Sequence, residues 1–455
     1  MPQNQTVMTY YKRTIDQKLQ EWKESSSRKP LLIRGARQVG KSTAVRELGK
    51  SFKYFVEVNL EKQPALRAMF TENIDVKKTC SNLSATLSIP IIPNETLLFI
   101  DEIQTSQQAI MSLRYFKEDY PELHVIAAGS LLEFALEELP SFGVGRIHSI
   151  YMYPFSFDEF LLAQDLQIQV ETKQAATSSE PLIAPLHNRL IEQLRSYYLV
   201  GGMPAAVTEW VESHDYLKVS KVHGDILDTF QDDFSKYKKR ISPVLLGQVL
   251  RSVAQQAGNK FVYSQVSRDI HSYSIKDALH LLSLAGLIIP VTHTNGNGLP
   301  LGAEEDTRYR KYLFMDTGLM LSYLSFPASD ILLSSEADFV NKGAISEMFA
   351  GLEIIKYNDE ITRPSLYYWQ HNSRNGNSEI DYLLAKDGKV MPVEVKASTR
   401  GSMQSLYIFM RKHHIGDAIR TSLENFSQFT HLDTEDDGAS RHIEVVPLYA
   451  LSNIK

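Results

Sequence analysis

Hydrophobic and polar positions alternate along residues 30–152 in the way expected of buried strands separated by helices. Four short runs are apolar on both faces, as strands of a parallel sheet are: LLIRG (31–35), YFVEVNL (54–60), TLLFID (96–101) and HVIAAGS (124–130). Helical segments fit between these runs, and such alternation is typical of an α/β domain. The pattern therefore predicts an α/β domain with a parallel sheet over residues 1–163.

The rest of the chain shows three further patterns. The polar stretch 164–185, with its Ser-Ser-Glu-Pro break, predicts a loop or insertion, and residues 186–240 predict a helical lid. Residues 241–315 read as three helical segments (244–258, 264–270 and 275–286) followed by two apolar strands (287–293 and 309–315), which is the winged-helix pattern. Residues 316–455 combine one long helix with strands and a further helix, and this predicts a second α/β domain.

The third helix of the predicted winged helix has two interpretations. In a DNA-reading winged helix it would enter the major groove with Lys276 and His280 as its polar contacts. Its sequence, IKDALHLLSLAG, is mostly apolar and has little basic character. The composition favours a connector between domains over a DNA reader.

Composition narrows the class of protein. A chain of 455 residues predicts two or three domains, and 43% hydrophobic with 22% charged residues is typical of a soluble globular protein. The single cysteine, Cys80, excludes an intrachain disulfide framework and a cysteine-rich zinc site. No run approaches the roughly 18 apolar residues of a spanning helix, and the N-terminus lacks a secretion signal. We therefore expect a cytoplasmic protein without membrane contacts. Its net charge of −6 means that DNA contacts would need a local basic patch.

A phosphate-binding loop lies between the first predicted strand and a predicted helix. Residues 35–42, GARQVGKS, match G-x-x-x-x-G-K-[ST]. In this loop the glycines let backbone N–H groups surround phosphates, and the helix N-terminus adds positive potential. Lys41 is expected to reach the β and γ phosphates, and Ser42 to coordinate Mg²⁺. The predicted nucleotide-binding residues are Gly35, Ala36, Arg37, Gln38, Val39, Gly40, Lys41, Ser42 and Thr43.

Two acids follow the third buried strand, at its C-terminal end, where α/β sheets bind ligands. We expect Asp101 to hold Mg²⁺ and Glu102 to orient and deprotonate the attacking water. A plain helix cap is the alternative for this acid pair. Ser130, at the end of the fourth strand, is predicted either to sense the γ-phosphate or to be a simple turn residue. Arg146 would contact the γ-phosphate, in the same chain or from a neighbouring subunit of a homo-oligomer, or form a surface salt bridge.

The nucleotide is expected to be ATP. The chain has no N-K-x-D motif for guanine, and no LSGGQ-like segment of transporter ATPases. The segments GARQVGKST, FIDEIQ, the Gly-Ser strand end and MYPFSFDEF resemble a bacterial and archaeal AAA+-type ATPase family whose members carry a C-terminal domain of unknown function. GGMPAAV (201–207) and the C-terminal E-I-D…E-V-K pattern also fit this family. Related switch-type ATPases place a Gly-x-Pro against adenine, which makes Pro204 a candidate adenine contact; otherwise it is a helix-start proline.

The C-terminal region contains a hairpin whose register can be worked out. Asp387-Gly388 is a strong two-residue turn signal between two alternating segments. Residue 386 then faces 389 and paired numbers sum to 775, so that Asp381 faces Glu394. Two facing carboxylates repel unless a cation lies between them or one of them is protonated, and hard cations such as Mg²⁺ take carboxylate oxygens. Lys396 lies on the same face and would stabilise charge that develops on a phosphate.

The combination D-x12-E-x-K, with an acid on a preceding helix, resembles the PD-(D/E)xK restriction-endonuclease-like fold. This resemblance implies that Glu347, Asp381 and Glu394 hold Mg²⁺, with Mn²⁺ as an alternative ion, and that Lys396 is catalytic. Phosphate contacts would come from nearby basic residues, namely Arg374, Lys386, Lys389, Arg400, Arg411 and Lys412. The opposing interpretation is a retained fold that does not cut.

Two functions from different classes are consistent with these residues. The first is an AAA+-like ATPase that acts on DNA, with metal-dependent endonuclease activity in repair or defence. The second is an ATP-dependent signalling switch whose nuclease-like domain binds protein or DNA without cutting it. An adaptor has no reason to keep Asp381, Glu394 and Lys396 on one face, and this pattern favours the first function.

Overall fold

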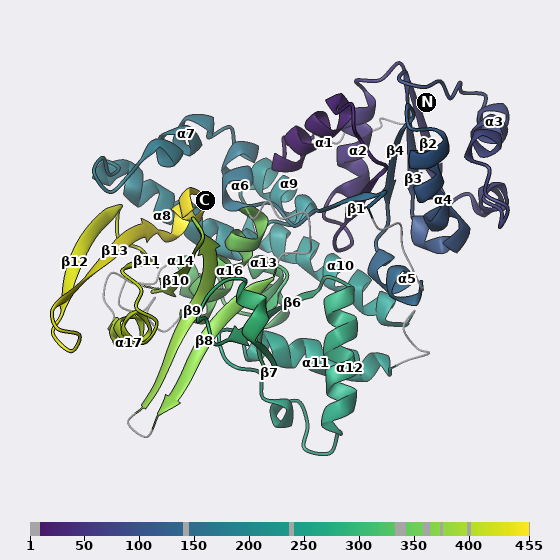
Figure 1. Cartoon of the computed structure of the whole chain (residues 1–455). Helices are drawn as coiled ribbons and strands as arrows, with labels where there is room; N and C mark the ends of the chain where they lie inside the picture. Colours follow the sequence, from purple (N-terminus) through teal and green to yellow (C-terminus); the bar gives the residue numbers. More distant parts are fainter. Residues whose placement is uncertain are drawn as a thin grey trace. The chain divides into compact units, whose positions relative to one another are not determined.

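A computed structural model describes residues 10–139, 145–235, 241–332, 343–357, 365–373, 376–397 and 402–454. They fall into two compact units (Figure 1). The first contains residues up to Phe155 together with Leu284–Gly286. The second contains Ser156–Ser283 and most of the chain from Leu287 onward. No helix among these residues is long and apolar enough to cross a membrane.

The first unit is built on a five-stranded parallel sheet with the order β2-β3-β4-β1-β5. Its strands are β1 (Leu31–Arg34), β2 (Tyr54–Asn59), β3 (Thr96–Asp101), β4 (His124–Ala128) and β5 (His148–Tyr151). The four strands predicted from apolar runs are confirmed as β1 to β4. Every residue of β3 and β4 is buried, as in a sheet covered on both faces. Helices α1 (Thr14–Glu24) and α2 (Lys41–Gly49) lie on one side, and α3 (Val76–Leu87) and α4 (Gln107–Asp119) on the other (Figure 1).

The core on the α3 and α4 side follows the two-residue period of the strands. Val56 and Val58 of β2 and Leu98 and Ile100 of β3 pack there, while the residues between them face the opposite side. Phe55 and Phe99 stack on that opposite side. The short helix α5 (Leu132–Glu138) follows β4. This packing fixes the C-terminal ends of β1 and β3, where the phosphate loop and the acid pair lie.

The second unit begins with five helices. They are α6 (Phe157–Ala163), α7 (Gln167–Ala175), α8 (Ala184–Val200), α9 (Pro204–Ser213) and α10 (Tyr216–Phe234). The prediction of a loop over 164–185 is wrong for residues 167–175, which form α7. The physical reason is a buried ion pair: Lys173 on α7 lies 2.9 Å from Asp158 on α6 and donates a hydrogen bond to Ser452 Oγ (2.7 Å). A helix therefore forms in this polar stretch of sequence, and residues elsewhere in the chain stabilise it.

The predicted winged helix is only partly observed. Helices α11 (Pro243–Gln255) and α12 (Ser272–Leu284) form, whereas the middle segment contains only the short 3-10 turn Tyr263–Gln265. Strands β6 (Ile288–Thr294) and β7 (Glu305–Phe314) pair as an antiparallel hairpin, as a wing would. However, β6 also pairs in parallel with β8, so this hairpin belongs to the C-terminal sheet. The expected domain boundary at residue 315 therefore separates β6 and β7 from the other strands of the sheet to which they belong.

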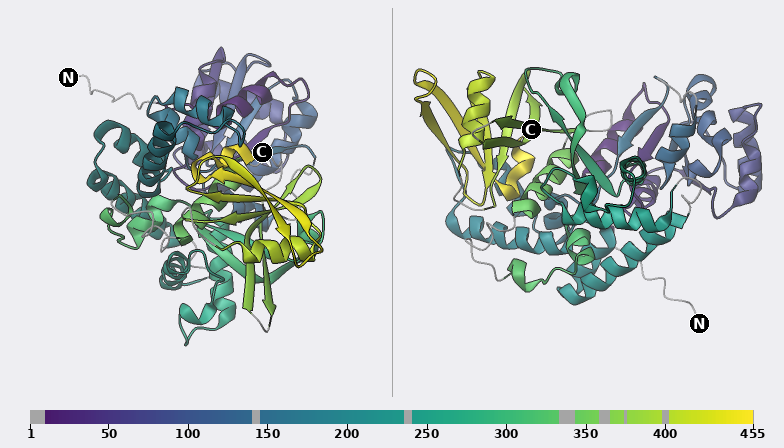
Figure 2. Two further views of the ribbon diagram at one scale, coloured as in Figure 1. Left: turned by 90° about the vertical axis from the view of Figure 1, so that its left-hand side faces the viewer. Right: turned by 90° about the horizontal axis from the view of Figure 1, so that it is seen from below.

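That sheet has eight strands in the order β12-β13-β11-β10-β9-β8-β6-β7 and is mixed, with parallel and antiparallel neighbours. Its remaining strands are β8 (Leu366–Ser373), β9 (Gly376–Lys386), β10 (Lys389–Val395), β11 (Asp417–Ser422), β12 (Ser427–Asp433) and β13 (Ala439–Pro447). The helices of this region are α13 (Thr317–Tyr323), α14 (Ser329–Leu332), α16 (Gly343–Tyr357) and α17 (Gln404–Lys412), before the final turns Leu448–Ile454. Strands β12 and β13, in yellow in Figure 2, form the outer hairpin.

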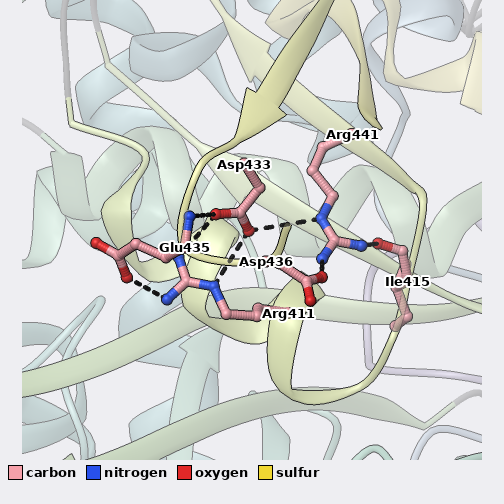
Figure 3. A network of polar contacts seen from close by, with 6 residues as sticks. All are labelled: Arg411, Ile415, Asp433, Glu435, Asp436 and Arg441. Atoms are coloured by element: carbon pink, nitrogen blue, oxygen red, sulfur yellow. Dashed lines mark hydrogen bonds and ion pairs between the residues drawn. The ribbon is translucent and has the colours of Figure 1, made fainter. Parts of the chain in front are cut away.

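An arginine and carboxylate network ties α17 to the turn of that outer hairpin (Figure 3). Arg411 on α17 donates two hydrogen bonds of 3.1 Å to Asp433 and also pairs with Glu435. Arg441 on β13 pairs with Asp436 and donates to the Ile415 carbonyl (3.0 Å). Because its guanidinium is engaged by two acids, Arg411 has a structural role here, in contrast to the phosphate contact that was expected from its sequence position.

Candidate functional site

The phosphate loop is shaped by glycines that no other residue could replace. Gly35 has a φ of +136°, and a β-carbon added there would lie 2.2 Å from the Met152 carbonyl oxygen. Gly40 has a φ of +97° and forms the N-cap of α2. These left-handed conformations are strained for residues with a side chain. The loop therefore turns sharply at the C-terminal end of β1 and leads directly into α2, whose N-terminus is available to an anion.

Lys41 opens α2 with its side chain buried under the loop. Its ammonium donates hydrogen bonds to the carbonyls of Gly35 (2.8 Å) and Ala36 (2.6 Å). Burial lowers the pKa of Lys41 to about 8, although the charges of Glu102 and Asp101 act in the opposite direction. A buried ammonium that donates to carbonyl oxygens is suited to the negative oxygens of a phosphate chain.

Ser42 and Asp101 form the candidate magnesium position of the first unit. The hydroxyl of Ser42 lies 3.1 Å from both carboxylate oxygens of Asp101, and Asn59 donates to the same carboxylate at 3.1 Å. Burial, together with the charge of Glu102, raises the pKa of Asp101. A hydroxyl and a carboxylate in contact are oxygen ligands of the kind that Mg²⁺ prefers, so the residues fit the ion. Asn59 was missed, although its place at the end of β2, in register with Asp101, is a usable signal.

Glu102 lies next to Ser130, as the order of the strands requires. Its carboxylate accepts hydrogen bonds from Gln104 Nε2 (2.6 Å) and from Ser130 Oγ (3.2 Å), and Glu102 itself adopts a left-handed φ of +51°. A β-carbon at Gly129 would lie 2.0 Å from the Gln104 amide oxygen, so the Gln104 side chain would have to move if this glycine were replaced. Gln104 and Ser130 together orient Glu102. The role of Ser130 as a γ-phosphate sensor stays a prediction.

Arg13, which the sequence did not single out, supports the loop from α1. Its guanidinium donates to the carbonyls of Val39 (3.2 Å) and Tyr153 (2.9 Å) and lies 3.9 Å from the centre of the Phe155 ring. Val39 is fully buried below the loop. Arg13 thus links the phosphate loop to the segment that follows β5, and no local motif announces such a contact.

The other predicted ATP-site residues are less tightly placed. Arg146 pairs with Glu118 on α4, and 46% of its side chain is exposed, which corresponds to the alternative interpretation as a surface salt bridge. Arg37 is partly exposed in the loop, and Thr43 is exposed in the first turn of α2. Pro204 is the first residue of α9 in the second unit. Contacts of Arg146 with the γ-phosphate and of Pro204 with adenine stay predictions.

The predicted C-terminal hairpin register is confirmed. Lys389 pairs with Lys386, and the ladder continues to Val393 opposite Tyr382, so that every pair sums to 775. Asp387 and Gly388 have φ values of +50° and +73°, as a two-residue turn of this kind requires. The ladder ends one pair before Asp381 and Glu394. There Asp381 accepts a hydrogen bond from the Val395 N–H (2.7 Å).

An acid cluster forms on one face of this sheet. Carboxylate oxygens of Glu347 on α16 and of Glu379 and Asp381 on β9 all lie within 4.8 Å of one another. This set contains Glu379 in place of the expected Glu394. Glu379 and Asp381 are two residues apart on β9, so their side chains lie on the same face of the sheet. Asp381 also reaches the end of β10, where it accepts the hydrogen bond from Val395. Burial raises the pKa of Glu347 to about 8, and the charge of Asp381 adds to this rise, against the effect of Lys311.

Lys311 enters this cluster from β7 and was not predicted. Its ammonium lies 2.7 Å from Glu347 Oε1 and also pairs with Glu379. Burial lowers the pKa of Lys311, but the charges of Glu347, Glu379 and Asp381 outweigh this effect and raise it overall. No motif connects Lys311 with these acids, because β7 and β9 are separated in the sheet by two other strands.

Glu394 and Lys396 form a second pair beside the cluster. One carboxylate oxygen of Glu394 pairs with Lys396, while the other is buried and has no hydrogen-bond partner within the described part of the chain. Burial raises the pKa of Glu394 to about 8, and the charge of Asp381 adds to the rise. An unpartnered buried carboxylate oxygen next to Asp381 is what a divalent cation would satisfy, so the residues fit a metal ion.

A polar cavity of about 490 Å³ reaches the acid cluster. Glu379 lies in its wall together with residues of the loop after α11 and with Gln370 of β8; the lining comprises Gln255, Gln256, Gly258, Asn259, Lys260, Val262, Gln265, Gln370 and Glu379. Of the expected phosphate contacts, Arg374 and Arg400 lie outside the described residues. Lys386 donates to the Ile454 carbonyl (2.8 Å), and Lys412 lies over the Trp369 ring. Whether these basic residues contact phosphate stays a prediction.

Three family models match separate parts of this chain. Residues 27–161 match the family described as an AAA domain. Residues 191–330 and 342–450 match two domains of unknown function, DUF8612 and DUF4143. No curated protein matches the chain.

Three solved structures show limited similarity. The Walker-type ATPase PABY2304 of Pyrococcus abyssi has 16% identity and a TM-score of 0.44, over 69% of this chain and 96% of that one. The Orc1 protein of Aeropyrum pernix, solved in complex with DNA, has 12% identity and a TM-score of 0.30, over 70% and 94%. Unliganded Pif1 from Bacteroides sp. has 15% identity and a TM-score of 0.21, over 42% and 52%. Residues 27–161, which match the AAA domain family, contain the phosphate loop and both acids of the candidate nucleotide site.

Proposed function

We propose that this chain binds and hydrolyses ATP and acts on DNA, which its C-terminal domain cuts with the help of a divalent metal ion. Contact between Ser42 and Asp101 beneath the phosphate loop supports the ATPase activity. The observation that carries the cutting activity is the cluster of Glu347, Glu379 and Asp381 within 4.8 Å, beside Glu394 and Lys396.

In the ATPase domain each residue has a defined task. The loop amides and Lys41 would bind the β and γ phosphates, and Ser42 and Asp101 would hold Mg²⁺, which neutralises phosphate charge. Glu102, oriented by Gln104 and Ser130, would accept the proton of the attacking water. In this proposal the residues that bind ATP are different from the base that activates the water.

In the C-terminal domain the acids would bind Mg²⁺ or Mn²⁺, which supplies a Lewis acid for the phosphodiester. Glu347, Glu379 and Asp381 are the candidate ligands, and Glu394 lies beside them with one oxygen unpartnered among the described residues. Lys396, whose ammonium rests on Glu394, would stabilise negative charge on the phosphate. DNA would approach through the polar cavity that Glu379 lines.

A specific observation favours a second function, an ATP-dependent signalling switch with a non-cutting C-terminal domain. Lys311 already places a positive charge between Glu347 and Glu379. A cluster neutralised in this way can serve structure alone, and the domain would then bind protein or DNA.

We also propose that α12 connects domains and does not read DNA. Its apolar residues Ile275, Leu279 and Leu282 are buried, and Lys276 is the single lysine or arginine among its exposed residues, which are Ser272, Tyr273, Lys276 and His280. The change Lys276→Glu is therefore expected to leave DNA binding in a filter or polarisation assay unchanged within about two-fold. A strong loss of binding would overturn the connector role.

A cleavage assay separates the two main functions. Plasmid and oligonucleotide DNA are incubated with Mg²⁺ or Mn²⁺, with and without ATP, using the purified full-length chain. Asp381→Asn and Lys396→Ala are expected to abolish cleavage, while Lys221→Ala, an exposed lysine on α10 to which no site is assigned, serves as the control. Cleavage that persists in both site variants, or that is absent from the unmodified protein under every condition, contradicts the nuclease proposal.

A further inference from the structure

The acid cluster contains a cation of its own. Lys311 is 1% exposed, and its ammonium contacts Glu347 from one side and Glu379 from the other. The same ammonium lies 5.2 Å from the centre of the Tyr368 ring. A lysine is rarely buried without a partner, and here the two carboxylates are the partners that make its burial tolerable.

Charge counting shows what the site still lacks. A bound divalent cation would favour the ionised forms of the four acids Glu347, Glu379, Asp381 and Glu394, and with the two lysines Lys311 and Lys396 charged this leaves two negative charges. One divalent cation would balance them. It would need oxygens of Glu347 and Glu379, and these are the groups that the Lys311 ammonium already contacts. A divalent ion at the oxygens that the Lys311 ammonium contacts would be repelled by it, so the ion and the ammonium compete for Oε1 of both acids.

We propose that Lys311 is an internal cation that holds the acid cluster together when no metal is bound, and that a divalent ion binds by displacing its ammonium from Glu347 and Glu379. This inference rests on the proposed function only in treating the cluster as a cation site. The polar cavity gives the ion its route, because Glu379 lies in its wall. The expected consequence is a weak metal site in the natural protein, whose affinity is set by a residue of the neighbouring β-hairpin.

The test measures Mn²⁺ binding directly and not through activity. Mn²⁺ is titrated into nucleotide-free, full-length protein, and free Mn²⁺ is followed by electron paramagnetic resonance. Lys311→Met keeps the length of the side chain and removes its charge, and it should bind Mn²⁺ at least roughly ten-fold more tightly than the unmodified chain. Adding Asp381→Asn to Lys311→Met should remove the added binding, which assigns it to the cluster.

Lys356→Met is the matched control. Lys356 lies in the last turn of α16, nine positions after Glu347, and its buried side chain pairs with Glu353 at 3.0 Å. Its loss should leave Mn²⁺ affinity unchanged within about two-fold. Thermal unfolding adds a second readout. Lys311→Met should unfold at a lower temperature than the unmodified chain in EDTA, and Mn²⁺ should raise its unfolding temperature by the larger amount.

Lys311→Met that is folded by circular dichroism and binds Mn²⁺ no more tightly than the unmodified chain overturns the inference. Should Lys311→Met not fold even with Mn²⁺, Lys311→Gln, which also removes the charge but can still donate hydrogen bonds and keeps all four acids, replaces it in the same titration. Failure of the two proposals is distinguishable. Tighter Mn²⁺ binding without DNA cleavage refutes the nuclease alone, whereas cleavage by the natural protein with unchanged Mn²⁺ affinity in the variant refutes the role of Lys311 alone.

Discussion

Replacing Lys41 with methionine is the sharpest test of the ATP site, because the side chain has two opposing effects on the protein. Its ammonium is buried and held by two carbonyls, at 2.8 and 2.6 Å, so the change loses two hydrogen bonds but also removes a buried charge. A charge-assisted hydrogen bond contributes about 1.5–3 kcal/mol, and burial of a cation opposes this. We therefore expect the free energy of unfolding without nucleotide to change by no more than about 2 kcal/mol.

ATP binding should respond far more strongly. With nucleotide bound, the same ammonium would donate at least two charge-assisted bonds to phosphate oxygens, or about 3–6 kcal/mol. Lys41→Met should then weaken ATP binding roughly 10²- to 10⁴-fold.

Calorimetric titration with ATP and Mg²⁺ measures the affinity, and urea unfolding measures the stability. Lys50→Met, an exposed lysine just past the end of α2, is the matched control and should change neither. ATP binding by Lys41→Met within about three-fold of the unmodified protein would refute the reasoning.

Three further predictions concern the same domain. Glu102→Gln should keep ATP binding but lose hydrolysis by roughly 10²-fold or more, because the amide still accepts the bond from Gln104 but cannot take a proton; calorimetry and a phosphate-release assay separate the two. Arg13→Met should lower both the unfolding temperature and the ATP affinity, since the carbonyls of Val39 and Tyr153 lose their donor; unfolding with and without ATP measures this, and an unchanged affinity would count against a role in supporting the loop. Burial, with the charge of Arg28, lowers the pKa of His124 from 6.5 to about 4, so the unfolded chain binds the proton more readily; stability should be fully present above about pH 6.5 and fall by at most about 3 kcal/mol toward pH 4, a loss that His124→Phe should remove in urea unfolding series.

The ATP site could be predicted from the sequence because its signals are local. The glycines of the loop, Lys41 and Ser42 occupy eight consecutive positions, and their conformations follow from the turn between β1 and α2. Asp101 and Glu102 follow directly on a fully buried strand. The sequence did not predict the residues that support this site, namely Arg13, Asn59 and Gln104. Their partners depend on the order of the strands and on the packing of α1.

In the C-terminal region, too, the sequence predicts local features but does not predict contacts between distant elements. Asp387 and Gly388 determine the register of β9 and β10 because a two-residue turn leaves one pairing, and that register is sufficient to put Asp381 and Glu394 at the same end of the hairpin. Helix α7 was missed, because its buried Lys173 finds Asp158 and Ser452 only in the folded chain.

Only the tertiary structure brought Lys311 to Glu347 and Glu379, which lie 36 and 68 positions away in the chain. The order of the strands determines this contact, because β6 pairs with β8, and β7 is the next strand after β6 in the sheet. Periodicity and turn chemistry act over a few residues, whereas an ion pair between separate elements depends on how whole strands are arranged, and no short stretch of sequence contains that information.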